Sequence, residues 1–361
     1  MALAAAYHDA RDLFPHNPAG RVRFLEAGTV AFKPDPARWG GLRLQPLLSS
    51  LARAGDPLGD LCSAAPGHGL AVEAWTVFLH SDRLGFEHPD CAPQNAFGDP
   101  YLTDLCPSHP DVRAYALALA GDVARHGVRA VVAESLHFHP FEHGYHHERS
   151  FLDLSEQARG LLGLCFCPHC LAAARARDVD AGVLHAVVRG ELERALAGED
   201  DGEPPAGLAG YAEARMHTVT TLALEVAGRV AEEGAELRFL DASGAVKGYA
   251  TGRPEGAPTA SGAHQLGIDL QALAAAGIAI DALGYAAEPE RLRTDLEGYR
   301  ALVPDADLGL LLRPMPPDCR APENLAEKVA VARAAGVERI GFYAYGFMQL
   351  AALDWIRAAL D

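Results

Sequence analysis

Seven short apolar segments recur along the chain, and stretches with helical signals separate them. Runs such as VRAVVAES and LGLLLRP are almost continuously apolar, which is typical of strands covered on both faces in a parallel sheet. Strands that alternate with helices in this way indicate a parallel α/β fold. The predicted strands are Ala2–His8, Leu70–His80, Val128–His137, Glu236–Ser243, Ile278–Tyr285, Asp307–Arg313 and Glu338–Gly346.

Proline and glycine mark the helices between these strands. Ser108, followed by Pro110, opens a predicted helix that closes at Gly127, and Pro322 opens another that ends at Gly336. The AAGI and AAGV junctions before two later strands are typical of helix–glycine–strand connections in βαβ units.

This succession predicts a (β/α)8 TIM-like barrel, and we expect a single barrel domain over residues 1–361. The first strand begins almost at Met1, so the pattern lacks an eighth strand and its helix. Three explanations stay open: the barrel is open there, the chain start is truncated, or a partner fills the gap. A doubly wound open sheet is the alternative fold, but no glycine-rich phosphate loop follows an early strand.

Two long segments interrupt the alternation of strands and helices. The insertion 138–234 follows the strand that carries Glu134, and it holds a histidine-rich stretch, a cysteine-rich stretch and extra helices. Within it, Ala197–Gly207 is a polar connector. The segment Ala250–His264 is rich in Gly, Pro, Ala and Thr, which predicts a mobile lid or loop.

The charge balance limits the partners. Lys and Arg total 31 against 48 for Asp and Glu, which gives a net charge of −17 and argues against nucleic-acid or anionic-membrane partners. No apolar run reaches the length of a bilayer, and the N-terminal stretch lacks the basic region of a secretory signal. An odd number of cysteines, with four in a metal-like pattern, favours a cytoplasmic protein over a disulfide framework. A homo-oligomer is compatible with this picture.

The cysteine pattern carries the clearest chemistry. Cys165, Cys167 and Cys170 place three thiols within one short turn, and Cys106 precedes an earlier predicted helix. Zinc takes four thiolates in a tetrahedron at roughly 2.3 Å, and such closed sites are structural. The pattern therefore predicts one structural Zn²⁺, with His169 as an alternative to Cys106. The competing interpretation is a set of buried cysteines that pack as small apolar side chains.

The segments LCPSHPDVRAY (Leu105–Tyr115) and LCFCPHCLAAARAR (Leu164–Arg177) resemble the zinc-binding segments of glycoside hydrolase family 42 β-galactosidases and related glycosidase-like barrels. The resemblance extends over roughly Trp75 to Arg177. It implies that Cys106, Cys165, Cys167 and Cys170 bind zinc, and that the fold is a (β/α)8 barrel.

Glu134 and Asp241 are the candidate catalytic carboxylates. Each lies near the carboxyl end of a predicted strand, the face at which barrel enzymes carry their active sites. In the resembled family, a Glu after an Asn on the fourth strand is the acid/base, whereas Ala133 precedes Glu134 here. The family's nucleophile is a Glu on the seventh strand, where this chain has Arg313. A buried carboxylate that holds loop backbone is the other interpretation for each residue.

The stretch HFHPFEHGYHHER (His137–Arg149) directly follows the Glu134 strand. Three interpretations compete: His137, His143 and His146 line a sugar pocket, or the stretch binds a second, catalytic metal, or it is a polar loop. The metalloprotease motif HExxH is absent from it.

Aromatic and polar residues near the other strand ends complete the predicted carbohydrate site. Aromatic faces stack on sugar rings, and His, Asn and Arg bind hydroxyls, although strand-end aromatics also pack helices onto a barrel. The further predicted substrate-binding residues are Tyr7, His8, His16, Asn17, Trp75, His80, Tyr285, Arg313, Tyr343 and Tyr345.

Three functions follow from these residues. The first is a glycoside hydrolase-like enzyme that acts on a carbohydrate through Glu134 and Asp241. The second is a metal-dependent hydrolase or isomerase that uses the histidine-rich loop. The third is a barrel that binds a carbohydrate without catalysis, and Arg313 in place of a seventh-strand Glu favours it. Fold alone does not choose among them.

Overall fold

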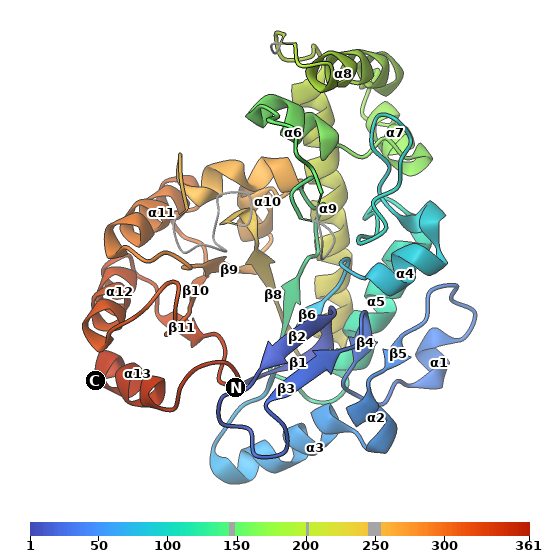
Figure 1. Ribbon diagram of the computed structural model, residues 1–361. Coiled ribbons are helices and arrows are strands. Elements are labelled where there is room, and N and C mark those ends of the chain that lie inside the picture. Colours follow the sequence, from blue (N-terminus) through green and yellow to red (C-terminus); the bar gives the residue numbers. More distant parts are fainter. Residues whose placement is uncertain (144–148, 200–201, 245–253) are drawn as a thin grey trace. The chain divides into compact units, whose positions relative to one another are not determined.

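The computed structural model describes all residues except 144–148, 200–201 and 245–253, so His146 and parts of both long segments lie outside the described residues. The chain divides into two compact units, which are described separately (Figure 1). Unit 1 comprises Met1–His8, Ala27–Glu236 and His264–Asp269, and unit 2 comprises Asp9–Glu26, Leu237–Ala263 and Leu270–Asp361. The expectation of a single domain stays a prediction.

The sheet of unit 1 has the strand order β7-β6-β1-β4-β5. Strands β1, β6 and β7 are mutually parallel, and β4 is antiparallel to β1 and parallel to β5. Val77 pairs with Glu134, so β6 and β7 end level with each other. The strands are β1 (Ala2–Tyr7), β4 (Thr29–Val30), β5 (Leu47–Leu48), β6 (Glu73–Val77) and β7 (Ala130–Glu134).

Two helices of unit 1 pack side by side, α5 (Pro110–Ala124) and α9 (Leu208–Glu232). Helix α5 confirms the helix predicted here, but its N-cap is His109, whose side chain accepts a hydrogen bond from the Asp111 amide, and not Ser108. The other helices are α1 (Pro36–Trp39), α2 (Ser50–Ala54), α3 (Pro57–Ala64), η1 (Ala65–His68), α4 (Asp82–Glu87), η2 (Pro89–Cys91), α6 (Glu156–Leu162), α7 (Pro168–Arg175) and α8 (Ala181–Leu196).

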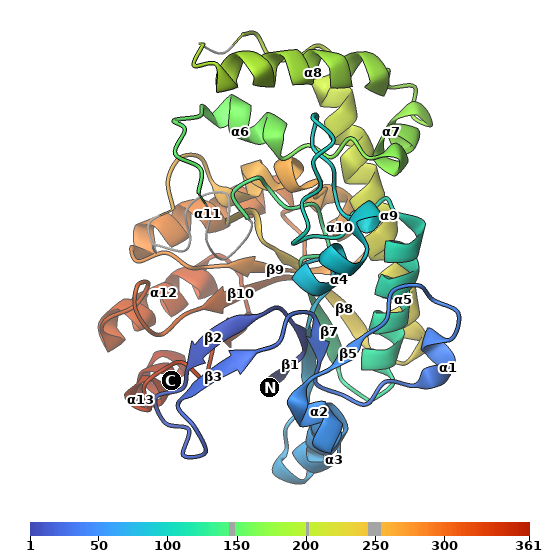
Figure 2. The same ribbon diagram turned by 45° about the vertical axis from the view of Figure 1, so that its right-hand side comes forward.

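The insertion builds a small apolar core of its own. Helices α6, α7 and α8 gather around one end of α9, away from the sheet of unit 1 (Figure 2). Leu161, Leu184 and Leu192 of these helices share one buried apolar cluster with Phe166, from the loop before α7, and with Tyr211 of α9. Since α9 also packs on α5, this single helix joins the insertion core to the strand–helix part of the unit.

Unit 2 contains four parallel strands in the order β11-β10-β9-β8 and a separate antiparallel hairpin, β2-β3. Helices α11, α12 and α13 lie along one side of β9–β11 (Figure 1). Helix α12 begins at Pro322, as predicted. The elements are β2 (Ala10–Leu13), β3 (Val22–Leu25), β8 (Glu236–Asp241), η5 (Thr259–Leu266), α10 (Leu270–Ala275), β9 (Ala279–Leu283), α11 (Pro289–Leu302), β10 (Leu308–Leu312), α12 (Pro322–Ala334), β11 (Arg339–Phe342) and α13 (Ala351–Leu360).

All seven predicted strands are confirmed, each shorter than its apolar segment. The prediction missed β2, β3, β4 and β5. The sequences of β2 and β3, ARDL and VRFL, alternate polar and half-buried positions, and β4 and β5 have two residues each, too short for any periodicity. Among the described residues, no helix is both long enough and apolar enough to cross a membrane.

A buried carboxylate fixes the N-terminal loops of unit 1 onto α5. Asp122 is fully buried, and its oxygens accept hydrogen bonds from the Trp39 indole at 2.6 Å, from the Asp35 amide at 3.1 Å and from the Arg125 guanidinium at 2.5 Å. Each donor is satisfied by a charged acceptor, which makes these bonds stronger than neutral ones.

Replacing this carboxylate tests its role. Asp122→Ala leaves the buried indole and amide donors without an acceptor, so we expect the free energy of unfolding to fall by about 2–4 kcal/mol in urea titrations. The matched control is Asp354→Ala on α13, where the side chain is 78% exposed, and we expect a change within about 0.5 kcal/mol. Equal effects of the two substitutions would contradict the assignment.

Candidate functional site

Glu134 ends β7 and lies half-buried beside Trp75 of β6. The indole Nε1 of Trp75 donates a hydrogen bond to the Glu134 carboxylate, and Trp75 is 9% exposed. Parallel pairing of β6 with β7 brings the two residues together, because Trp75 lies opposite Val132, two positions before Glu134. The neighbouring indole therefore fixes the direction of this carboxylate.

The backbone turns sharply directly after Glu134. Ser135 adopts a φ of 57°, in the left-handed region that residues other than glycine seldom occupy. The carbonyl of Ser135 accepts a hydrogen bond from the Leu79 amide, and that of Glu134 accepts one from the Phe78 amide. Such strained positions concentrate at functional sites, where the surrounding structure holds them in place.

Four histidines gather around Asp104 in unit 1. The Oδ1 atom of Asp104 lies 3.0 Å from His80 Nδ1, 2.9 Å from His139 Nδ1 and 4.0 Å from His143 Nδ1. The His139 and His143 rings are stacked with centroids 4.4 Å apart, and the His137 ring lies 5.0 Å from that of His139. This group, His80, Asp104, His137, His139 and His143, is called the histidine cluster below.

Tyr7 and His8 extend the histidine cluster from β1. Their rings stack with centroids 4.3 Å apart, and the His8 ring lies 5.5 Å from that of His80. Five predicted substrate-binding residues of unit 1 thus lie together, namely Tyr7, His8, His80, His137 and His143.

Burial and charge act in opposite directions within the histidine cluster. Burial alone would raise the pKa of Asp104, but the charges and hydrogen bonds of His139 and His80 outweigh it and lower that pKa below its ordinary value. Burial, together with the charge of His139, lowers the pKa of His137 to about 3, and this ring bonds the Phe138 carbonyl at 2.7 Å. His137 is therefore a neutral imidazole at physiological pH.

A pocket of about 230 Å³ adjoins the histidine cluster. Aromatic and proline side chains form most of its wall, and the polar groups of the histidine cluster occupy one side. Apolar walls with a few convergent polar groups are typical of small-ligand sites. The lining includes Phe86, Tyr101, Phe138, Phe141, Asp104, His139 and His143.

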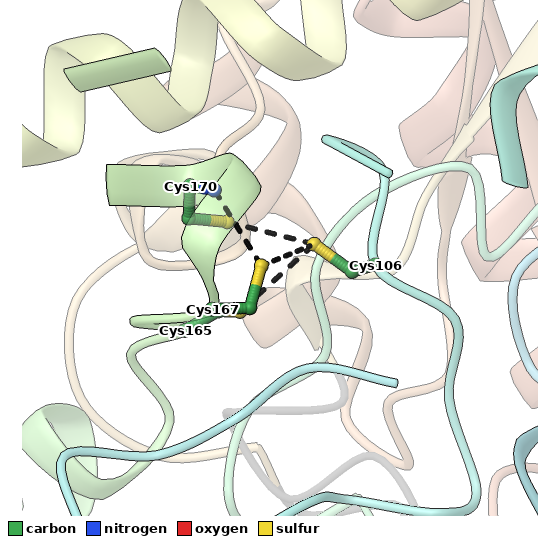
Figure 3. A group of neighbouring side chains, drawn as sticks. All are labelled: Cys106, Cys165, Cys167 and Cys170. Carbon is green, nitrogen blue, oxygen red and sulfur yellow. Dashed lines mark hydrogen bonds between the residues drawn. The ribbon is translucent and has the colours of Figure 1, made fainter. Parts of the chain in front are cut away.

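The four cysteines form a second, closed group (Figure 3). The Sγ atom of Cys106 lies 3.9 Å from that of Cys165, 3.6 Å from that of Cys167 and 3.5 Å from that of Cys170, and all four side chains are buried. Four thiolates bound to zinc at about 2.3 Å would be separated by about 3.8 Å in a tetrahedron. The donor set and its spacing therefore fit zinc.

The turn that carries three of these thiols is held from several sides. Cys167 is the N-cap of α7, and its Sγ accepts a hydrogen bond from the Cys170 amide at 3.5 Å. The Tyr211 hydroxyl of α9 donates to the Cys165 carbonyl at 2.5 Å. Burial and the hydrogen bonds of the neighbouring thiols raise the pKa of Cys106 above its ordinary value.

Asp241 ends β8 in unit 2 and is fully buried. It accepts hydrogen bonds from the amide and hydroxyl of Ser243 and from the Tyr299 hydroxyl, the last at 2.5 Å. Burial raises its pKa, and these hydrogen bonds oppose the rise. This environment is the one expected of a carboxylate that anchors a loop. Glu134 belongs to the other unit, and the catalytic role of Asp241 stays a prediction.

The remaining strand-end residues of unit 2 form two small groups. The Arg313 guanidinium lies over the Tyr285 ring, 4.1 Å from its centroid, and the Tyr343 ring is 6.2 Å from that of Tyr285. His16 contacts Tyr345 through its ring, at 4.7 Å, and bonds the Tyr345 carbonyl at 2.9 Å.

Asn17 lies in the turn of the β2-β3 hairpin, where its side chain accepts a hydrogen bond from the Ala19 amide at 2.9 Å. This contact caps a turn, in the manner common for asparagine. No contact of Asn17 in the described structure tests its predicted part in carbohydrate binding, which stays a prediction.

Sequence reasoning missed three residues of these groups. Asp104, at the centre of the histidine cluster, carries no motif, although it lies two positions before Cys106. His139 belongs to the histidine-rich stretch but was not selected from it. Asp318 forms a two-pronged ion pair with Arg313, with both distances 2.6 Å.

No protein-family profile and no curated protein matches the sequence. Solved structures do match. A β-galactosidase from the psychrophilic Marinomonas ef1 shares 10% identity at a TM-score of 0.53, over 89% of this chain and 53% of that one. An α-L-fucosidase isoenzyme 2 from Paenibacillus thiaminolyticus shares 13% at 0.50, over 92% and 41%.

A β-galactosidase from Bacillus circulans sp. alkalophilus shares 12% identity at a TM-score of 0.50, over 87% of this chain and 45% of that one. The chain thus spans about half the length, or less, of these structures. At such low identity the likeness concerns the fold: the chain has a mixed α/β fold of the (β/α)8-like type found in glycoside hydrolases.

The environment of Asp241 predicts a pH-dependent effect of Tyr299. Because the pKa of Asp241 is raised on folding, the folded chain retains this proton to higher pH, so the contribution of Asp241 to stability falls as the pH rises above about 4. Tyr299→Phe removes a donor to the carboxylate. We expect it to cost about 1 kcal/mol near pH 4.5 and about 2–3 kcal/mol near pH 7.

Urea unfolding at both pH values measures this difference. The control is Tyr345→Phe, because Tyr345 is 60% exposed and Phe keeps both the ring and the backbone carbonyl that contact His16. A cost of Tyr299→Phe that stays constant with pH would show that the carboxylate is not the partner that matters.

Proposed function

We propose that this chain is a glycoside hydrolase-like enzyme that acts on a carbohydrate, with Glu134 as general acid/base. The observation that carries the proposal is the Glu134 carboxylate at the carboxyl end of β7, held in direction by the Trp75 indole. Burial lowers the pKa of His80, but the hydrogen bond and charge of Asp104 outweigh it and raise that pKa, and the charges of Asp82 and Glu134 add to the rise.

The pocket beside the histidine cluster supports a carbohydrate as ligand. Phe86, Tyr101 and Phe141 offer aromatic faces, and the polar side chains of His139 and His143 lie in the same wall. Sugars present apolar ring faces and hydroxyl groups, which match such a mixed surface. The β-galactosidases and the fucosidase with the same fold act on glycosides by their names, which supports this substrate class.

A barrel that binds a carbohydrate without hydrolysis is the second candidate. The ion pair between Arg313 and Asp318 favours it, because it occupies the place of the family's seventh-strand nucleophile. The complete burial of Asp241 favours it as well, since a nucleophile or base needs contact with substrate or water. Turnover of nitrophenyl glycosides distinguishes the two candidates.

Glu134→Gln keeps the side-chain shape and removes the ionisable group. We expect kcat on any accepted nitrophenyl glycoside to fall by about 100-fold or more with little change in KM, because proton transfer contributes about that much. Glu236→Gln, at the exposed amino end of β8, is the matched control and should leave both constants unchanged. Wild-type rates in Glu134→Gln would refute the assignment.

Trp75→Phe tests whether the indole acts through Glu134. It removes the N–H donor and keeps an aromatic ring, so we expect kcat to fall by about 10-fold while the fold persists. In the Glu134→Gln background, the same substitution should cost little more, since residues that act as a unit are non-additive. Additive losses would assign Trp75 an independent role.

We further propose that Cys106, Cys165, Cys167 and Cys170 hold one structural Zn²⁺. All four sulfurs lie within 4.8 Å of one another, and each thiol is buried, which leaves no open position for a substrate. The ion would stabilise the turn before α7 and the loop that carries Cys106.

Metal analysis tests the cysteine site. Mass spectrometry of purified protein should find zinc bound at this site, and Cys106→Ser should lose that zinc and lower the free energy of unfolding by about 3 kcal/mol or more. Cys62→Ser on α3 lies outside the group and should retain the metal. Unchanged zinc content and stability in Cys106→Ser would contradict a structural site.

A further inference from the structure

We propose that His80, Asp104 and His143 form a second metal site, for a divalent first-row transition ion, separate from the cysteine site. Glycoside hydrolysis by carboxyl groups needs no such ion, so the inference goes beyond the proposed function and does not depend on it. All three residues belong to unit 1 and to described segments.

The ligand atoms converge at the spacing that a metal requires. One nitrogen or oxygen from each residue lies within 4.8 Å of the others, and Asp104 Oδ1 is 3.0 Å from His80 Nδ1 and 4.0 Å from His143 Nδ1. Bonds of about 2.0–2.1 Å in a tetrahedron place neighbouring ligand atoms about 3.3 Å apart. Two imidazoles and one carboxylate suit Zn²⁺, Fe²⁺, Co²⁺ or Mn²⁺ better than Ca²⁺ or Mg²⁺.

The backbone holds two of the ligands opposite each other before any ion binds. His80 and Asp104 form an isolated antiparallel bridge. On either side of it, the Ser81 amide donates to the Thr103 carbonyl at 2.9 Å and the Leu105 amide to the Leu79 carbonyl at 2.8 Å. The preformed pair lowers the entropy lost when a metal binds.

Unsatisfied polar atoms point to a missing partner at this place. Among the described residues, His143 Nδ1 and His139 Nε2 are buried and have no hydrogen-bond partner, and the His139 side chain is 4% exposed. Buried imidazole nitrogens normally find a partner, because each unmet one costs about 1–3 kcal/mol. An ion at Asp104 would bind His143 Nδ1 and balance the carboxylate charge.

The surroundings of Asp104 resemble the outer shell of a metal site. Thr103 Oγ1 donates to Asp104 Oδ2 at 3.1 Å, which turns Oδ1 toward the imidazoles. His139 Nδ1 lies 2.9 Å from Oδ1, at ion-pair distance. Hydrogen bonds such as the one from Thr103 fix ligand direction in known metal sites.

The site differs from the cysteine site in being open. It has three protein ligands, and Asp104 and His143 also line the pocket of about 230 Å³. Three ligands beside a cavity leave a coordination position for water or a hydroxyl of a ligand, as in catalytic metal sites. The ligand class for this position is a small hydroxylated or carbonyl compound that the ion can polarise.

The test is metal binding by the full chain, with Zn²⁺ and Mn²⁺ as probes in separate equilibrium dialyses followed by elemental analysis. With zinc in excess, Cys106→Ser isolates the proposed site and should bind one ion. In that background, Asp104→Asn and His143→Ala should each weaken binding by about 100-fold. His68→Ala, an exposed histidine on η1, is the control and should bind as its parent does.

His143→Ala guards against a folding artefact. The His143 side chain is 34% exposed, so its removal should leave the thermal unfolding of the metal-free chain unchanged. If Cys106→Ser does not fold, the wild-type chain is used instead and should bind two zinc ions. His143→Ala in the wild-type background should then bind one. Binding of no second ion, or equal binding in His143→Ala and His68→Ala, overturns the proposal. Glu134→Gln should bind the ion normally, so loss of hydrolysis and loss of metal remain distinguishable.

Discussion

The main-chain hydrogen bonds between residues 79–81 and residues 103–105 are the interaction on which both chemical centres of unit 1 depend. They attach the loop that carries Asp104 and Cys106 to the segment that leaves β6. Pairing of β6 with β7 then sets Glu134 against Trp75, and the carbonyl of Ser135 accepts the Leu79 amide. Backbone geometry, rather than side-chain attraction, therefore gathers groups that lie far apart in sequence.

Two carboxylates at strand ends show how environment separates residues that look alike in sequence. Glu134 is half-buried, and an indole donor orients its carboxylate beside polar side chains. Asp241 is fully buried and surrounded by donors from Ser243 and Tyr299. The Glu134 side chain is partly exposed, whereas the Asp241 side chain is enclosed by hydrogen-bond donors. Position at a strand end therefore does not by itself fix the environment of a carboxylate.

Short apolar runs were enough to predict the seven parallel strands, most of which are buried on both faces, although β1 and β11 are partly exposed. The prolines that begin α5 and α12, Pro110 and Pro322, also marked the helix starts in the sequence. The short strands β4 and β5 were not, since pairing with neighbours defines them and their own composition does not. Spacing also selected the cysteines, whose sulfurs lie together. Asp104 was not predicted, because it comes close to His80 only when its loop folds back on that residue.

Leu105 alone separates Asp104 from Cys106, and this adjacency ties the two centres to one stretch of backbone. The side chains of Asp104 and Cys106 are both buried and reach two different groups, the histidine cluster and the four cysteines. A change in the backbone at Leu105 would therefore move a member of each group at once.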